Sequence, residues 1–239
     1  MKFSLCIPMY NEISIIKETA LTLSEYMSAN FDDYEIIFCN DGSTDGCDET
    51  VKALDLPHVR VIGYPQNRGK GHAVRTAMLE ATGDIRIFTD SDLAYGTDVI
   101  EAIVKAFEQN PKAELVIGSR NLHKDGYEGY TRLRRMASKL YIRIVCAASG
   151  LRLSDSQCGC KAFSAKAAKQ IFSRCEIDGF AFDLEALLWA MMWEYRWVEI
   201  PVRVINHGDS KVRVARDTWK MLRDIRKMNK RIRAESLRK

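Results

Sequence analysis

The stretch Ile85-Arg86-Ile87-Phe88-Thr89-Asp90-Ser91-Asp92 decides the fold of this chain. Residues 85–89 are mostly apolar and predict a short buried strand. Asp90 and Asp92 then fall at the carboxyl end of that strand, the edge where open α/β sheets bind ligands. Two carboxylates one residue apart repel each other unless a cation lies between them. A divalent metal that carries a diphosphate would supply that cation, and a solvated, Asp-rich turn is the alternative.

The composition is that of an ordinary globular domain, with 239 residues, 46% of them hydrophobic, and a net charge of +4. No run of 18 apolar residues occurs, so we expect no membrane-spanning helix. Residues 1–8 are too short an apolar run for a signal peptide and predict a first strand. Seven scattered cysteines favour buried thiols in a reducing cytosol over a disulfide framework. Cys158-Gly159-Cys160 lacks a second Cys/His pair at zinc spacing.

Apolar runs alternate with segments of helical periodicity, which predicts parallel βαβ units. The expected strands are 2–7, 34–39, 59–63, 85–89, 113–118, 158–164 and 197–205, and the expected helices are 12–29, 45–54, 71–81, 97–109, 132–148, 182–195 and 216–233, with a polar loop at 122–130. The fold class predicted is α/β, with a Rossmann-like, mostly parallel central sheet flanked by helices. We expect a single domain over residues 1–212, followed by a basic amphipathic helix at 213–239.

Polar motifs follow the first two expected strands, at the same sheet edge as the Asp pair. The first is Pro8-Met9-Tyr10-Asn11-Glu12, in which the tyrosine ring can stack on a base and Glu12 can accept hydrogen bonds from sugar hydroxyls. A plain turn capped by Asn11 is the alternative. The second is Asn40-Asp41-Gly42-Ser43-Thr44-Asp45, which places Asp41 at the edge and a capping hydroxyl before the next helix.

A third motif, Asn67-Arg68-Gly69-Lys70-Gly71-His72-Ala73, precedes the expected helix at 71–81. Two cations and two glycines at a helix N-terminus make a candidate anion site. The motif is neither G-x-G-x-x-G, because Val74 holds the third glycine position, nor a P-loop. A helix start with solvated cations is the alternative.

The series P-x-Y-N-E, N-D-G-S-T-D, N-R-G-K-G and D-S-D resembles family-2 glycosyltransferases with the GT-A fold. The resemblance covers about residues 3–228 and continues in Gly118-Ser119-Arg120, in D-S-Q-C-G-C-K-A-F at 155–163, in F-D-L-E at 182–185, in E-I-P-V at 199–202 and in N-H-G-D-S-K-V at 206–212. The later motifs are similar to those of the branch that moves a sugar onto a polyprenyl phosphate. That branch contains the dolichyl-phosphate glucosyltransferases, which the 155–163 run resembles more closely, and the mannose synthases.

The resemblance implies a set of site residues by position. The nucleotide sugar would be held by Pro8, Tyr10, Glu12, Asp41, Arg68, Lys70 and Asp90. Mg²⁺ or Mn²⁺ would be bound by Asp90 and Asp92, and the catalytic residues would be Asp90, Asp92, Arg120 and Asp183. The acceptor phosphate would be met by Arg134, Ser138, Lys161 and Lys211.

Three positions depart from the pattern of the family. Ala94 stands where mannose synthases often have a metal-binding Gln, and Ile205 stands where they have Arg. Both departures weaken a strict GDP-mannose assignment. Cys160 replaces a phenylalanine in an expected core position.

The chemistry of the acceptor separates two predictions. A phosphate monoester, with a second pKa near 6, is mostly dianionic at neutral pH and needs no strong general base. It needs cations instead, for which Arg134, Arg135, Lys161 and Lys211 are candidates. A sugar hydroxyl would require a carboxylate base, and Asp183 or Glu185 would then serve. The resemblance implies an inverted, β-linked product, and a metal and fixed cations would stabilise the leaving diphosphate.

Two basic segments suggest contact with a membrane or with solvent. Residues 213–239 carry eleven Lys/Arg against three Asp/Glu, with apolar residues at helical spacing. Such a helix can lie in a membrane interface, or it can pack on the domain with a solvated face. Residues 132–143 alternate cations with apolar residues, as an ordinary amphipathic helix does. No nucleic-acid motif accompanies the charge, so nucleic acid is not an expected partner.

The sequence therefore predicts a cytoplasmic enzyme, peripheral on the cytoplasmic face of a membrane, that moves glucose or mannose from a nucleotide sugar to a polyprenyl phosphate. One alternative is a glycosyltransferase with a sugar-hydroxyl acceptor in polysaccharide synthesis. Another is a sugar-phosphate nucleotidyltransferase, which would need a Gly-rich loop near the first strand, whereas residues 8–20 contain no glycine. The third is a noncatalytic relative that binds lipid or nucleotide.

Overall fold

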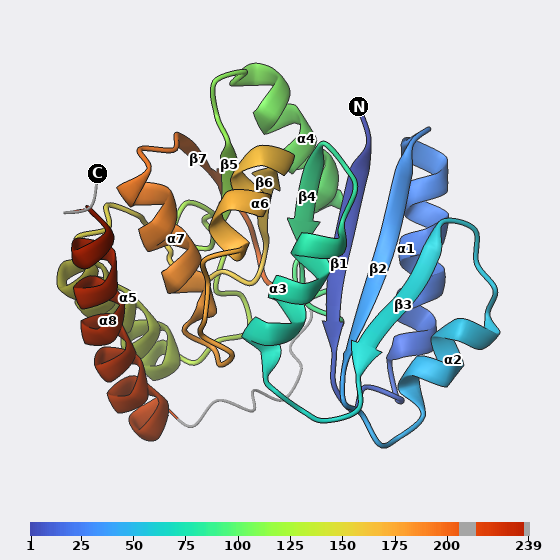
Figure 1. The fold of residues 1–239 in the computed structure, drawn as a ribbon, viewed down its shortest axis with the longest axis horizontal. Coiled ribbons are helices and arrows are strands. Elements are labelled where there is room, and N and C mark those ends of the chain that lie inside the picture. The colour runs from blue at the N-terminus through green and yellow to red at the C-terminus, as the bar shows by residue number, and fades with distance from the viewer. Residues whose placement is uncertain (206–213, 237–239) are drawn as a thin grey trace.

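A seven-stranded sheet forms the centre of the protein in a computed structural model that describes residues 1–205 and 214–236 (Figure 1). The strands lie in the order β3-β2-β1-β4-β6-β5-β7. Strand β6 runs antiparallel to both of its neighbours, and the other pairings in the described sheet are parallel. The predicted α/β fold with a mostly parallel central sheet is therefore confirmed.

The strands and helices alternate along most of the chain. The strands are β1 (Phe3–Met9), β2 (Tyr34–Asp41), β3 (Val59–Tyr64), β4 (Ile85–Phe88), β5 (Leu115–Ser119), β6 (Lys161–Ser164) and β7 (Trp197–Pro201). The helices are α1 (Ile16–Asn30), α2 (Cys47–Ala53), α3 (Lys70–Glu80), α4 (Asp98–Gln109), α5 (Arg132–Ser149), α6 (Ala165–Phe172), α7 (Phe182–Met192) and α8 (Val214–Ser236).

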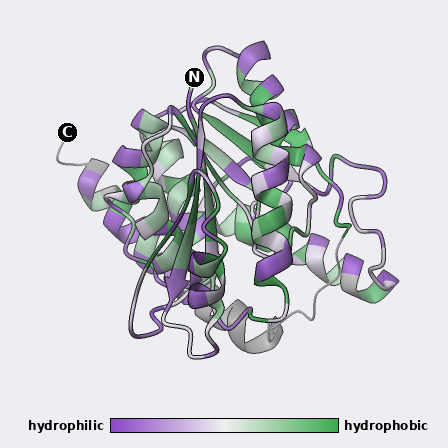
Figure 2. Cartoon of the chain, turned by 90° about the vertical axis from the view of Figure 1, so that its right-hand side faces the viewer, coloured by the Kyte–Doolittle hydropathy of each residue, from purple (hydrophilic) through white to green (hydrophobic). Residues whose placement is uncertain are grey.

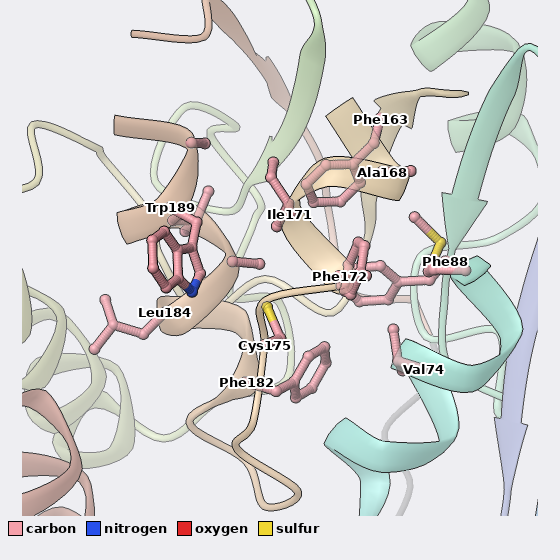
Figure 3. Packing of buried hydrophobic residues seen from close by; sticks show 14 of the residues in the cluster. Val74, Phe88, Phe163, Ala168, Ile171, Phe172, Cys175, Phe182, Leu184 and Trp189 are labelled. Atoms are coloured by element: carbon pink, nitrogen blue, oxygen red, sulfur yellow. The ribbon is translucent and has the colours of Figure 1, made fainter. Parts of the chain in front are cut away.

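Each face of the sheet has its own hydrophobic core because side chains alternate along a strand. Leu5 and Ile87 point into the core shared with α1, α2 and α4. Cys6 and Phe88, their neighbours in sequence, point into the core shared with α3, α6, α7 and part of α8. Figure 3 shows rings of this second core, among them Phe163 and Phe172, gathered between the sheet and these helices. The two cores fix the sheet between two layers of helices.

Strand β1 continues through Pro8 to Met9, beyond its predicted end at residue 7. Its pairing with β4 stops at the Cys6–Phe88 pair, whereas its pairing with β2 continues to Met9 and Asn40. Beyond Cys6, β1 is therefore paired with β2 alone, and the absent N–H of a proline can be tolerated there.

The sequence prediction missed helix α6. The expected strand at 158–164 is confined to β6, and the chain turns into α6 immediately afterwards. The Ser164 side chain caps that helix by accepting a hydrogen bond from the backbone N–H of Ala167 at 3.2 Å. The preceding residues 158–160 form a loop that approaches the Asp pair.

Helix α8 packs on the domain through α5 and α7 (Figure 1). Ile225 and Met228 are 2% and 3% exposed and belong to the core beside α7. Arg231 forms ion pairs with Glu176 at 2.7 Å and Glu185 at 3.0 Å. This part of the apolar stripe therefore covers protein and does not present itself to a membrane, which was the other arrangement that the sequence allowed.

Figure 2 shows hydrophilic and hydrophobic residues side by side on the coloured helices in view. Among residues 1–205 and 214–236, no helix combines the length and the hydrophobicity needed to cross a bilayer.

A buried carboxylate joins β1, β2, β3 and the loop before β4, away from the Asp pair. Glu35 accepts hydrogen bonds from the hydroxyls of Ser4 at 2.7 Å and Thr82 at 2.8 Å, and from the guanidinium of Arg60 at 3.1 Å. Burial alone would raise its pKa, but these hydrogen bonds outweigh burial and bring the pKa to about 2. The ionised Glu35 carboxylate therefore stabilises the folded protein.

We expect Glu35→Gln to lower the free energy of unfolding at neutral pH by about 3 kcal/mol. Because the pKa is lowered in the folded state, this stability is present above the ordinary glutamate pKa near 4.3 and is lost as the pH falls towards 2. Urea unfolding at several pH values should therefore give free energies of unfolding for wild type and variant that become equal in acid. Asp32→Asn, at an exposed carboxylate on the same side of the sheet, should change little; a constant difference between Glu35→Gln and wild type at all pH values would contradict the account.

Candidate active site

The Asp pair lies at the carboxyl edge of the sheet, the edge toward which the arrows of β1, β3 and β4 all point in Figure 1. Strand β4 ends at Phe88, and the turn that follows carries Asp90 and Asp92. The Ser91 carbonyl accepts a hydrogen bond of 2.7 Å from the Thr19 hydroxyl of α1. The Asp92 Oδ1 accepts one of 3.0 Å from the backbone N–H of Ala94. The turn is thus held from both sides.

Lys70, the first residue of α3, is the cation beside the Asp pair. Its Nζ forms a close ion pair with Asp90 Oδ1. Burial alone would lower the pKa of Lys70, but Asp90, Asp183 and Asp92 together outweigh burial and raise it. Burial and then the charge of Asp90 raise the pKa of Asp92. The two aspartates therefore repel each other as expected, and Lys70 offsets part of the repulsion.

A second ion pair lies next to the first. Lys161 of β6 is fully buried and places its Nζ 2.9 Å from Asp183 Oδ1. The same ammonium donates to the Cys158 carbonyl at 2.5 Å. Burial raises the pKa of Asp183, and the charges of Lys161 and Lys70 oppose that rise. The site thus brings together three carboxylates and two ammonium groups, which leaves an excess of negative charge.

A divalent cation fits this site. Asp90 and Asp92 provide hard carboxylate oxygens, and the unbalanced negative charge favours a cation. Within the described ranges, no group of three or more His, Cys, Asp and Glu side chains could hold a metal. Mg²⁺ commonly uses one or two carboxylates, with water and substrate phosphates completing its octahedron. The residues present match that mode, in which the donor diphosphate supplies ligands of its own.

Gly159 lies directly against the Asp90 carboxylate, and the sequence alone did not identify this glycine as part of the site. A Cβ atom at this glycine would lie 2.5 Å from Asp90 Oδ2. The Tyr95 hydroxyl fixes the loop by accepting a hydrogen bond of 3.0 Å from the Gly159 N–H. The glycine is visible in the motif at 155–163. Only the fold shows that Gly159 lies against the Asp90 carboxylate.

We expect Gly159→Ala to reduce metal-dependent transfer by about tenfold to a hundredfold, because Asp90 must move to admit the methyl group and misplacement of a reacting group by about 1 Å costs on this order. Steady-state rates over a range of Mn²⁺ concentrations would measure the effect. Gln157→Ala, in the same loop, controls for loop substitution, and thermal unfolding controls for loss of the fold. A variant with wild-type rate and metal dependence would show that the close approach has no functional role.

Asp41, one of the residues predicted to contact the nucleotide, accepts hydrogen bonds from several protein donors. Its carboxylate is 3% exposed and accepts hydrogen bonds from the Tyr64 hydroxyl at 2.7 Å and the Asn67 amide at 2.9 Å. It also accepts from the backbone N–H groups of Arg68 and Gly69, each at 2.9 Å at its shortest. The carboxylate is occupied by these donors and organises the loop between β3 and α3.

The N-terminus of α3 is not an open anion site, contrary to the candidate that the sequence offered. The Gly71 N–H donates to the Asp178 carbonyl at 2.8 Å. A Cβ at Gly69 would lie 2.4 Å from that same carbonyl oxygen. The Asp178 side chain also pairs with Arg75 at 2.7 Å. The loop before α7 thus covers the start of α3, and Lys70 reaches the Asp pair through its side chain.

The remaining donor residues lie at the same edge. Pro8 is buried in β1, Tyr10 is 41% exposed beyond it, Glu12 is partly exposed, and Arg68 is exposed. Asn11 joins the loops after β1 and β2, because its N–H donates to Ser43 Oγ at 3.1 Å and its Oδ1 accepts from the Thr44 N–H at 2.9 Å. The exposed tyrosine ring is therefore mounted on a fixed loop.

Arg120 is buried in an ion pair with Asp155. Its guanidinium makes two hydrogen bonds to that carboxylate, at 2.7 and 3.0 Å, and it is 9% exposed. It lies over the Tyr127 ring at 5.4 Å, and the side chains of Arg135 and Lys139 of α5 lie 5.8 Å from the same ring. The predicted contact of Arg120 with the donor is not available in this arrangement, whereas Arg135 and Lys139 bring cations to its neighbourhood.

The predicted acceptor residues do not form one cluster in the described structure. Lys161 is fully buried with Asp183, which corrects the expectation that it touches the acceptor phosphate. Ser138 lies partly exposed on α5. Arg134 belongs to α5, but its side chain lies outside the described part of the structure, as does the whole of Lys211.

Residues 4–172 match the family described as glycosyl transferase family 2. A dolichyl-phosphate beta-glucosyltransferase of Trichomonas vaginalis is 32% identical over 221 residues, which are 87% of this chain and 65% of the relative. The enzyme of the same name from Saccharomyces cerevisiae is 30% identical over 243 residues, which are 93% of this chain and 72% of the relative. This chain thus spans about two thirds of the length of these relatives.

Among solved structures, glucosyl-3-phosphoglycerate synthase from Mycobacterium tuberculosis, in complex with Mn²⁺, uridine diphosphate and phosphoglyceric acid, has a TM-score of 0.69. It is 19% identical, with 97% of this chain and 78% of that chain covered. Mannosyl-3-phosphoglycerate synthase from Rubrobacter xylanophilus has a TM-score of 0.65 at 16% identity, with 98% and 75% covered. These structures share the fold, and the sequence match establishes that the chain belongs to glycosyl transferase family 2.

Proposed function

We propose that the protein transfers a hexose, with inversion, from a nucleoside-diphosphate sugar to a polyprenyl phosphate. The observation that carries this proposal is the charge arrangement at the sheet edge, where Asp90 and Asp92 lie beside Lys70 and the buried Asp183–Lys161 pair. This arrangement suits a metal-bound diphosphate leaving group. The relatives named dolichyl-phosphate beta-glucosyltransferase support the choice of acceptor.

A bound Mg²⁺ or Mn²⁺, held by Asp90 and Asp92, would stabilise negative charge on the departing diphosphate. Tyr10 and Glu12 would contact the nucleoside and Arg68 the donor, as exposed groups around the same edge. Pro8 and Asp41 act beneath them by shaping β1 and the loop before α3. Arg120, paired with Asp155, would hold the Tyr127 ring in place beside α5.

The reaction requires no general base for a phosphate acceptor. A phosphate oxygen attacks the anomeric carbon, a new C–O bond forms, and the bond to the nucleoside diphosphate breaks. Asp183 is held by Lys161 and oriented within the charged cluster, so we assign it to positioning. Arg135 and Lys139 would attract the acceptor phosphate, together with Arg134, Ser138 and Lys211.

The enzyme would work at a membrane surface, because a polyprenyl chain holds its phosphate there, and we place it on the cytoplasmic face. We propose UDP-glucose as the first donor to test, since the named relatives are glucosyltransferases. Ala94 and Ile205 also depart from the pattern of the mannose synthases.

A donor panel tests this proposal. The purified protein is incubated with polyprenyl phosphate in detergent, Mg²⁺ or Mn²⁺, and one radiolabelled donor at a time: UDP-glucose, UDP-galactose or GDP-mannose. We expect lipid-extractable label with one hexose donor and its loss on addition of EDTA. Absence of labelled lipid with every donor and both metals would contradict the proposal.

A further inference from the structure

Helix α5 exposes an apolar stripe that no described part of the protein covers. Leu133, Met136, Leu140 and Ile144 are 78%, 69%, 59% and 43% exposed. They recur at spacings of three and four residues, so at roughly 100° per residue they lie along one side of the helix. Ile142 and Val145, on the opposite side, are 3% and 0% exposed and anchor α5 to the domain. The stripe is therefore a continuous outward surface on a helix that is fixed from behind.

The charges of α5 indicate what could cover this stripe. From Arg132 to Ser149 the helix contains five Lys/Arg and no Asp or Glu. Arg132, Arg135 and Arg143 are exposed, and Lys139 is partly exposed. By helical spacing Arg132, Lys139 and Arg143 lie on the flank between the outward stripe and the inward face, whereas Arg135 lies nearer the inward face. A surface that combines exposed large apolar side chains with cations alone is complementary to an anionic lipid bilayer.

Helix α8 provides a contrast within the same protein. It is also basic and amphipathic, but its Ile225 and Met228 are buried against the domain and its Arg231 pairs with two glutamates. Helix α5 lies next to it and has its apolar side chains in solvent. The stripe on α5 is thus exposed, whereas Ile225 and Met228 of the α8 stripe are buried against the domain.

The position of α5 relates the stripe to the candidate active site. Arg135 and Lys139 lie over the Tyr127 ring, on which Arg120 at the end of β5 also lies. The helix that would touch lipid therefore borders the region where an acceptor phosphate would arrive. This link rests on the proposed function, whereas the exposure and the charge of α5 do not.

We propose that α5 is the membrane-docking element, with Leu133, Met136, Leu140 and Ile144 inserted at the lipid interface and Arg132 and Arg143 facing anionic headgroups. The helix lies parallel to the bilayer surface and holds the active site beside the lipid phosphate.

Co-sedimentation with vesicles of phosphatidylcholine and phosphatidylglycerol tests the docking without donor or acceptor. Met136→Gln/Leu140→Gln removes apolar surface and keeps the charge and the helix propensity. We expect its partition coefficient to fall at least about tenfold. The matched control is Leu21→Gln/Leu79→Gln, at side chains on α1 and α3 that are 43% and 41% exposed, and it should bind as the wild type does. Equal binding of both double variants and wild type would overturn the proposal.

A charge variant tests the cations that flank the apolar stripe of α5. Arg132→Gln/Arg143→Gln should lose about tenfold in binding to the anionic vesicles and little on vesicles of phosphatidylcholine alone. An equal loss on both kinds of vesicle would contradict the electrostatic part. Sedimentation velocity tests whether a second copy of the chain covers the stripe instead of lipid. If the wild type is a dimer, Met136→Gln/Leu140→Gln is a monomer, and vesicle binding is unchanged, the stripe is a dimer interface and the docking proposal is overturned.

Transfer to a short, water-soluble prenyl phosphate separates this inference from the proposed function. We expect Met136→Gln/Leu140→Gln to act on this acceptor at the wild-type rate while its rate on acceptor in vesicles falls. If the wild type does not glycosylate the soluble acceptor, the proposed function fails and vesicle binding still decides the docking. If Met136→Gln/Leu140→Gln binds vesicles and glycosylates the acceptor in vesicles as well as the wild type does, the docking proposal is wrong, whereas the proposed function is unaffected.

Discussion

Asp92→Asn should reduce hexose transfer by at least about a thousandfold, since it removes one of the two carboxylates available for the metal and metal stabilisation of the leaving group amounts to several kcal/mol. The side chain keeps its shape, and its oxygen can still accept the hydrogen bond from Ala94. Burial and the charge of Asp90 raise the pKa of Asp92, so folding penalises the ionised form of this carboxyl relative to the unfolded chain. The neutral amide should therefore leave the metal-free protein at least as stable as the wild type.

Two measurements separate this outcome from simple damage. Thermal unfolding at pH 7 with EDTA should give a Tm equal to or above that of the wild type, and product formation should be lost at every Mn²⁺ concentration. Asp98→Asn, at the start of α4, is the control carboxylate and should remain active. Near-normal transfer by Asp92→Asn would remove the metal role from this residue.

Lys161→Met should be the most destabilising single change at the site, by about 3–5 kcal/mol. It leaves the buried Asp183 carboxylate without the ammonium that lies 2.9 Å away. Urea unfolding monitored by tryptophan fluorescence would measure the loss.

The double variant Lys161→Met/Asp183→Leu tells whether the pair serves only stability. Replacing both charges by apolar groups should recover most of the lost free energy of unfolding, but transfer should remain low because Asp183 no longer takes part in the charged cluster with Lys70. A double variant that regains both stability and transfer would show that the pair is purely structural.

Much of the fold could be predicted from local patterns. Strands such as β4 and β2 are short apolar runs ended by polar residues, and their periodicity is local information. Helix α6 was missed because its eight residues follow β6 without a break, and the short apolar stretch before it resembled a longer strand. The extension of β1 through Pro8 depends on where β4 stops pairing, which no local pattern contains.

The candidate site was predicted less completely, because side chains find partners that the sequence does not pair. Asp90, Asp92 and Lys70 meet as expected at the sheet edge. Asp41 and Arg120, in contrast, are occupied by protein partners, and Lys161 reaches Asp183 from a strand 22 residues away in sequence. The sequence singles out charged residues at the sheet edge, but whether each side chain faces a ligand or the protein depends on tertiary burial.

The two basic helices show the same limit. Amphipathic spacing predicted both α5 and α8, but spacing alone cannot tell whether an apolar stripe faces a core or solvent. In the structure Ile225 and Met228 of the α8 stripe are buried, whereas Leu133, Met136, Leu140 and Ile144 of the α5 stripe are exposed.

The central claim is that the acceptor is a lipid phosphate, and a comparison of acceptors tests it most directly. Label from UDP-glucose, or from whichever donor the panel selects, is followed into polyprenyl phosphate, into the matching polyprenol without phosphate, and into a soluble oligosaccharide, with Mn²⁺ present. We predict a labelled lipid with polyprenyl phosphate alone, with the hexose β-linked to the phosphate. Label in the polyprenol or the oligosaccharide, with none in polyprenyl phosphate, would contradict the account.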